Sequence, residues 1–93
     1  RDISVLVNNA GLADDTLMAM MSFEKWDRVI RTSLDGFFNV TKPVIRRMIR
    51  NKAGSIVTIS SVSGLMGNRG QVNYSAAKAG LIGSSRSLAQ EVA

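Results

Sequence analysis

The chain has 93 residues, of which 45% are apolar and 20% charged, and its net charge is +5. It is one small globular domain at most, which excludes a disordered tail, a fibrous repeat and, because no apolar run approaches about 18 residues, a membrane-spanning segment. With no cysteine, no histidine and a start unlike a signal peptide, the chain lacks disulfides and the usual metal ligands, so we expect a cytoplasmic protein without a metal site.

The first predicted element is a strand at residues 3–7. This run is apolar and rich in β-branched residues, and two asparagines end it with a turn. A helix is predicted from residue 22 to about residue 32. Ser22 is a good N-cap for it, and Glu24 follows in the first turn, where a carboxylate opposes the helix dipole.

A second helix is predicted over residues 35–51. Its apolar residues form one broad face, and its arginines mostly occupy the other. Pro43 lies inside this pattern. Since proline removes a backbone hydrogen bond and crowds the previous turn, we expect a local bend there. Ala53 and Gly54 then predict the end of the helix.

The second half of the chain predicts a strand and a long helix. Residues 55–59 are another short apolar run of the strand type. A loop with three glycines follows, at Gly64, Gly67 and Gly70. The helix predicted over residues 72–92 is rich in alanine, serine and glycine, so it should pack closely against a neighbour.

The predicted order of strand, helix, helix, strand and helix indicates the α/β class with a doubly wound parallel sheet. Both strands lack a polar face, which is typical of strands buried on both sides between helices. Two strands alone make a marginal sheet, and the chain opens almost on a strand and ends inside a helix. We therefore expect residues 1–93 to be the central part of a single larger domain, supplying about two strands and three helices.

Tyr74 and Lys78 are the first candidate catalytic pair. They lie four residues apart on a predicted helix, so their side chains share one face. A tyrosine hydroxyl is a poor acid at neutral pH, but a nearby ammonium stabilises its phenolate, and such a phenol can protonate a carbonyl oxygen. A chance helical pair is the alternative, because the pair alone is a weak motif.

Two further candidates follow the predicted strands, where open parallel sheets bind their ligands. Ser61 can donate a hydrogen bond to a substrate oxygen, although serines are also ordinary loop residues. The run Asn8-Asn9-Ala10-Gly11 lets a flat ligand approach the backbone, with the Asn9 amide as donor and acceptor. Taken alone, such a run is more often a turn.

In this order and at this spacing, NNAG at residues 8–11, Ser61, Tyr74 and Lys78 resemble the short-chain dehydrogenase/reductase family. The resemblance covers the whole chain and is closest to the 3-oxoacyl-acyl-carrier-protein reductases. Five stretches carry that closer likeness: residues 59–64, 66–68, 70–74, 76–83 and 87–89. The resemblance implies a Rossmann fold whose dinucleotide fingerprint and C-terminal substrate loop are absent from this chain.

By this resemblance Tyr74 would be the proton donor and Ser61 would hold the substrate carbonyl. Lys78 would assist Tyr74 and bind the ribose hydroxyls of a nicotinamide cofactor, which performs the hydride step. The cofactor would also contact Tyr74 and three residues of the first loop: Asn9, Ala10 and Gly11. We expect NADP, with NAD as the alternative, because the residue that chooses between them is not in the chain. The isolated chain should then bind either cofactor weakly or not at all.

The sequence departs from the family at Ser33, within the stretch TSLDG at residues 32–36. Family members usually have asparagine there, and by resemblance it holds a kink whose free carbonyl positions a water beside the lysine. Ser33 keeps the carbonyl but has a shorter side chain. We therefore expect Ser33 to be a fourth catalytic position and the turnover of the enzyme to be reduced.

The charge excess is confined to residues 42–52, which hold no acidic residue. We name five residues of this segment the basic patch: Lys42, Arg46, Arg47, Arg50 and Lys52. A solvated helix face is the plainest interpretation. Docking of an acidic acyl carrier protein is the second, and it suits the reductase likeness. Nucleic-acid binding is disfavoured, because no aromatic residue interleaves the patch for base stacking.

These patterns and the resemblance predict an enzyme that reduces a 3-oxoacyl thioester, carried on acyl carrier protein or coenzyme A, to its 3-hydroxyacyl form. The resemblance also implies a homotetramer assembled through the helices at 35–51 and 72–92, with neither nucleic acid nor membrane as a partner. Two alternatives stay open. One is another alcohol or sugar dehydrogenase of the same family, and the other is a non-enzymatic binding or assembly module.

Overall fold

The computed structural model describes residues 3–61 and 63–92. In chain order the elements are β1 (Val5–Asn8), the 3-10 turn η1 (Met18–Met20), α1 (Phe23–Ile30), the π-helical turn η2 (Arg31–Asp35), α2 (Gly36–Asn51), β2 (Ser55–Thr58), α3 (Ser63–Met66) and α4 (Val72–Val92). Both predicted strands and all three predicted helices are present. The short helices η1 and α3 were not predicted.

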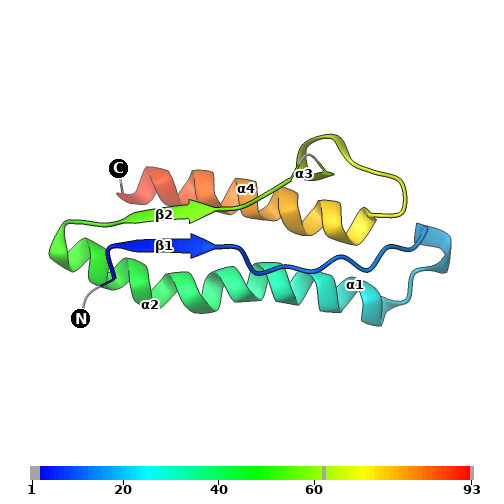
Figure 1. Ribbon diagram of the computed structural model, residues 1–93, viewed down its shortest axis with the longest axis horizontal. Helices are drawn as coiled ribbons and strands as arrows, with labels where there is room; N and C mark the ends of the chain where they lie inside the picture. The colour runs from blue at the N-terminus through cyan, green and yellow to red at the C-terminus, as the bar shows by residue number, and fades with distance from the viewer. Residues whose placement is uncertain (1–2, 62, 93) are drawn as a thin grey trace.

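The two strands form a parallel pair, and α2 is the helix of the crossover between them (Figure 1). The register runs from Val5 opposite Ser55 to Asn8 opposite Thr58. Because the strands are parallel, their carboxyl ends lie side by side, and the loops that follow them leave from the same edge. α2 contacts β1, and α4 contacts β2. The arrangement is that of part of a doubly wound Rossmann-type sheet.

The prediction that both strands are buried on two sides is wrong for the described chain. Val5 and Val7 are 55% and 54% exposed, while the residues between and after them are half-buried. β2 shows the same alternation, with Val57 46% exposed. The physical reason is that α2 and α4 pack against one face of the sheet, whereas no described element covers the other.

One continuous helical segment replaces the break predicted between residues 32 and 35. α1 passes through η2 into α2, and the residues at both ends of η2 keep right-handed helical dihedrals. At η2 the backbone therefore makes one wider helical turn instead of leaving the helix. Ser22 caps α1 as predicted, since its Oγ accepts from the Lys25 N–H at 3.2 Å. Helix α2 runs through Pro43 without interruption.

The predicted end of the second helix is confirmed. Lys52 adopts a left-handed conformation with φ 53°, and its N–H donates back to the Ile49 carbonyl at 3.2 Å. Gly54 follows at φ 141°, a conformation that residues with a side chain rarely adopt. A Cβ on Gly54 would lie 2.5 Å from Cγ of Met48, so this glycine also lets α2 pack closely under the start of β2.

The small residues of α4 allow the close packing that the sequence predicts. Val29 of α1 and Ala77 of α4 are fully buried, and Leu81 is 2% exposed. At Gly80 a Cβ would lie 3.0 Å from Leu34 Cδ2, so the absence of a side chain lets η2 rest directly on α4. This contact fixes η2, and with it Ser33, relative to the helix that bears Tyr74.

None of the helices within residues 3–61 and 63–92 is long and apolar enough to cross a membrane. The same residues contain no group of three or more histidine, cysteine, aspartate or glutamate side chains placed to hold a metal ion.

Candidate active site

Lys78 is a cation inside the protein. It lies in the second turn of α4 and is only 5% exposed. Its Nζ is 5.6 Å from the centre of the Tyr74 ring, one helical turn earlier, so the predicted pair does meet. The ion pairs among the described residues involve Asp14 and Asp27 and none of them includes Lys78. A buried ammonium without an acidic partner is costly unless other polar groups or a ligand solvate it.

Gly11 brings the loop after β1 against this ammonium. A Cβ built on Gly11 would lie 3.0 Å from Lys78 Nζ and 3.2 Å from Ser33 Oγ. The NNAG loop, η2 and α4 therefore converge on one point, although their residues lie far apart in the sequence. Any side chain at position 11 would occupy the space beside the cation.

Ser33 reaches this point because η2 is π-helical. The wider turn spans Arg31–Asp35, and Ser33 within it is 2% exposed. Its Oγ is buried and has no hydrogen-bond partner within the described chain. Single π-helical turns are rare and occur often at functional sites, and an unpaired buried hydroxyl favours a role in holding a ligand or a water.

Ser61 lies in the loop after β2, at the same edge of the sheet. Its Oγ is also buried without a hydrogen-bond partner in the part of the chain that is described. The preceding residue fastens this loop to α4, since Ser60 Oγ donates to the Lys78 carbonyl oxygen at 3.1 Å. At Gly64 a Cβ would lie 2.9 Å from the Lys78 Cβ, so α3 also packs tightly against α4 at Lys78.

A cavity of about 120 Å³ lies beside this convergence. Its lining includes Asn9, Ala10 and Ser33, and Asn9 and Ala10 are otherwise exposed. A larger groove of about 660 Å³ lies between the C-terminal ends of α2 and α4 and contains none of the candidate catalytic residues. The smaller cavity is the one next to the candidate residues, because Ser33 lines it and the Ser33 hydroxyl lies, like the Lys78 ammonium, close to Gly11.

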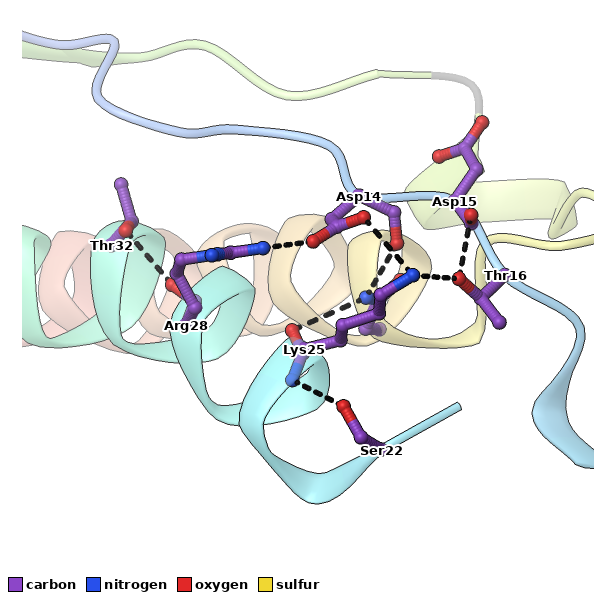
Figure 2. A network of polar contacts seen from close by, with 8 residues as sticks. Asp14, Asp15, Thr16, Ser22, Lys25, Arg28 and Thr32 are labelled. Carbon is purple, nitrogen blue, oxygen red and sulfur yellow. Dashed lines mark hydrogen bonds and ion pairs between the residues drawn. The ribbon is translucent and has the colours of Figure 1, made fainter. Parts of the chain in front are cut away.

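A polar network on the far side of the first loop was not predicted from the sequence. Asp14 lies between the side chains of Lys25 and Arg28 and forms ion pairs with both (Figure 2). Asn73, adjacent to Tyr74, is fully buried and donates to the Asp14 carbonyl oxygen at 3.2 Å. No sequence motif signals the contact between Asn73 and Asp14, because the two residues are 59 positions apart.

The comparisons with known proteins show the family to which this arrangement belongs. Residues 1–93 match the short chain dehydrogenase family over their whole length, and the chain belongs to that family. The family resemblance seen in NNAG, Ser61, Tyr74 and Lys78 is thereby confirmed.

Among curated relatives, the chain is 60% identical over 89 residues to the 3-oxoacyl-[acyl-carrier-protein] reductase FabG of Aggregatibacter actinomycetemcomitans, which covers 95% of this chain and 37% of the relative. It is 52% identical over 92 residues to FabG of Escherichia coli strain K12, covering 99% and 38%. It is 54% identical over 89 residues to an acetoacetyl-CoA reductase of Acinetobacter sp., covering 96% and 36%. The chain thus spans well under half the length of these relatives.

Substitution of Gly11 by alanine tests the convergence directly. The added methyl group would press on the end of the flexible Lys78 side chain, so Gly11→Ala should displace the ammonium while leaving the fold intact. In the full-length protein we expect dinucleotide-dependent turnover to fall by about tenfold or more, because small displacements at a reacting centre are costly. Steady-state kinetics and circular dichroism measure the two effects. Gly83→Ala is the matched control, since a Cβ there meets nothing within 4 Å; equal activities of the two variants would contradict the assignment.

Proposed function

We propose that the protein containing this chain reduces 3-oxoacyl thioesters to 3-hydroxyacyl thioesters with a nicotinamide cofactor. One observation carries the proposal: the loop after β1, η2 and α4 meet at the Lys78 ammonium, next to the Tyr74 ring. The relatives, 3-oxoacyl-[acyl-carrier-protein] reductases and an acetoacetyl-CoA reductase, supply the substrate class.

The residues present fit a nicotinamide cofactor. The buried Lys78 ammonium lacks an acidic partner among the described residues and would bind ribose hydroxyls, and the bare backbone of Gly11 leaves space beside it. Asn9 and Ala10, at the mouth of the small cavity, would line the ribose and adenine side, and Tyr74 would face the nicotinamide end. When bound, the reduced cofactor supplies the hydride. We propose NADPH, by likeness to the reductases, with NADH as the alternative.

The chain's own residues handle the proton and the substrate oxygen. As hydride adds to the C3 carbonyl carbon, the oxygen becomes an alkoxide and needs one proton. Tyr74 would donate the proton of its hydroxyl, and the Lys78 ammonium lies 5.6 Å from the centre of its ring. Ser61 Oγ, which has no partner among the described residues, would donate a hydrogen bond to the same oxygen and hold it in place.

Ser33 is proposed as a fourth catalytic position. It replaces the family asparagine, and its buried, unpaired Oγ lies across Gly11 from Lys78 Nζ. A water held near this hydroxyl and the Ser33 backbone could return a proton to Tyr74 after each turnover. The short serine side chain would hold that water less firmly than an asparagine amide does, so we propose that the return of the proton to Tyr74 is slow.

The basic patch suits an acidic carrier of the acyl chain. All five of its side chains are exposed on or just after α2, and the ion pairs among the described residues include none of them. This exposure agrees with a solvated helix face and equally serves docking of acyl carrier protein, whereas a coenzyme A thioester does not require it. A homotetramer in the cytoplasm, assembled through α2 and α4, completes the proposal.

The substrate test compares thioesters with simple alcohols and sugars. Full-length protein is assayed with acetoacetyl thioesters of acyl carrier protein and coenzyme A, and with secondary alcohols in the oxidation direction. We expect the thioesters to be preferred in kcat/KM. Preference for an alcohol or sugar would favour the other enzymatic alternative, and no turnover with either cofactor would favour the binding module.

Tyr74→Phe removes only the hydroxyl that donates the proton. We expect turnover to fall by about a hundredfold to ten thousandfold, the usual contribution of a positioned general acid, while dinucleotide affinity changes little. Stopped-flow measurement of thioester reduction gives the turnover, and a fluorescence titration gives the cofactor affinity. If the variant reduced thioesters at the wild-type rate, Tyr74 would not be the proton donor.

Ser33→Asn restores the family amide in a place that has room for it, since Ser33 lines the small cavity. We expect turnover in the full-length protein to rise, by up to about tenfold, because the relay water is held more firmly. Solvent isotope effects on kcat should fall at the same time, as proton return ceases to limit the rate. An unchanged kcat and isotope effect would show that position 33 does not limit turnover.

A further inference from the structure

Asn73 is the buried polar side chain that the catalytic scheme leaves unused. It precedes Tyr74 in the first turn of α4 and is 0% exposed. A primary amide offers two donor hydrogens and one acceptor oxygen, and burying it is costly unless these are satisfied. Its contacts therefore show what the position is for.

Both ends of the Asn73 amide are engaged. Its Nδ2 donates to the Asp14 carbonyl oxygen at 3.2 Å and makes a longer contact of 3.5 Å with the Lys25 carbonyl oxygen. Its Oδ1 accepts from the Tyr74 N–H at 2.8 Å. The first N–H groups of a helix have no partner within the helix, so this acceptor satisfies one that is otherwise free. One side chain thus joins the first loop, α1 and the backbone of Tyr74.

Neighbouring contacts hold the same two segments together. Thr16 N–H donates to the Gly70 carbonyl oxygen at 2.9 Å, and Gln71 Nε2 donates to Asp15 Oδ1 at 3.1 Å. Figure 2 shows how Lys25 reaches into the loop, where its Nζ donates to Thr16 Oγ1 at 2.9 Å. We name residues 14–16 and 70–73 together the seam; Asn73 is its buried member.

From this geometry we infer that Asn73 is a positioning residue, which sets where the Tyr74 backbone lies relative to the loop that follows NNAG. The inference rests on the proposed function, because it acts through Tyr74. Gly11 of the first loop lies beside the Lys78 ammonium, and Lys78 belongs to the same helix as Tyr74. The seam fixes the distance between the first loop and the start of α4. Within the seam, the Asn73 amide is the contact closest to Tyr74.

The experiment is a double-mutant cycle in the full-length protein, with acetoacetyl thioester and NADPH. Asn73→Ala removes all three contacts and should lower kcat by about ten- to a hundredfold, with KM and cofactor affinity within about threefold, because the misplacement affects the reacting hydroxyl. In a Tyr74→Phe background the same substitution should cost less than about twofold, since the group it positions is gone. Asn51→Ala, at an exposed position on α2, is the control and should leave kcat within about twofold.

Asn73→Ser keeps an oxygen beside the Tyr74 N–H but cannot reach both carbonyl oxygens. If the alanine variant does not fold, the same measurements are made on Asn73→Ser. The inference is overturned if kcat stays at the wild-type value, if KM rises while kcat does not fall, or if the loss is the same in the Tyr74→Phe background, which would indicate a merely structural role. If Tyr74→Phe itself retains full activity, the proposed function fails as well. If Tyr74→Phe is inactive and Asn73→Ala fully active, only this inference fails.

Discussion

The arrangement of this chain depends on one constraint, the burial of the Lys78 ammonium. At 5% exposure the cation has lost most of its water, and the ion pairs among the described residues do not include it. Taking an ion out of water costs several kcal/mol, and polar groups or a ligand must offset it. The tyrosine ring and the bare backbone at Gly11 lie beside it, and under the proposed function the ribose hydroxyls of the cofactor would offset the rest of this cost.

Each neighbouring element has a feature that brings it to this cation. Glycine at position 11 allows the first loop to approach the ammonium, and glycine at position 64 lets α3 pack against the Cβ and backbone of Lys78. The π-helical turn η2 turns Ser33 inward, and Gly80 lets that turn rest on α4 through Leu34. The parallel pairing of β1 and β2 places the two loops at one edge. Several close approaches of the fold therefore lie around Lys78.

The sequence predicted the elements and the proximity of Tyr74 and Lys78 well, because both follow from local spacing. The helix at 72–92 has the predicted bounds, and the four-residue interval of Tyr74 and Lys78 places both on one face. The π-helical turn was missed because its hydrogen bonds span only one residue more than those of an α-helix and because packing against α4 fixes it. The burial of both strand faces was predicted wrongly, because an apolar run does not reveal whether the same chain provides both covers.

Asn73 was missed for a different reason. It is adjacent to the predicted catalytic tyrosine, yet an asparagine near a helix start is ordinary in sequence. Its significance comes from complete burial and from partners 48 and 59 residues away, which only the folded chain reveals. The family membership follows from the match to short chain dehydrogenases, whereas the roles proposed for individual residues rest on the family resemblance together with the contacts around Lys78.

The most direct measurement of the central claim is the thermal stability of full-length Lys78→Met, with and without NADPH. If the ammonium is buried to hold the cofactor, the ligand-free variant should be at least as stable as the wild type, because methionine fills the space without a charge to desolvate. The rise in Tm that NADPH gives the wild type should then be lost. Lys52→Met, at an exposed position, should keep that rise. A Lys78→Met protein that NADPH stabilises as strongly as the wild type would contradict the account.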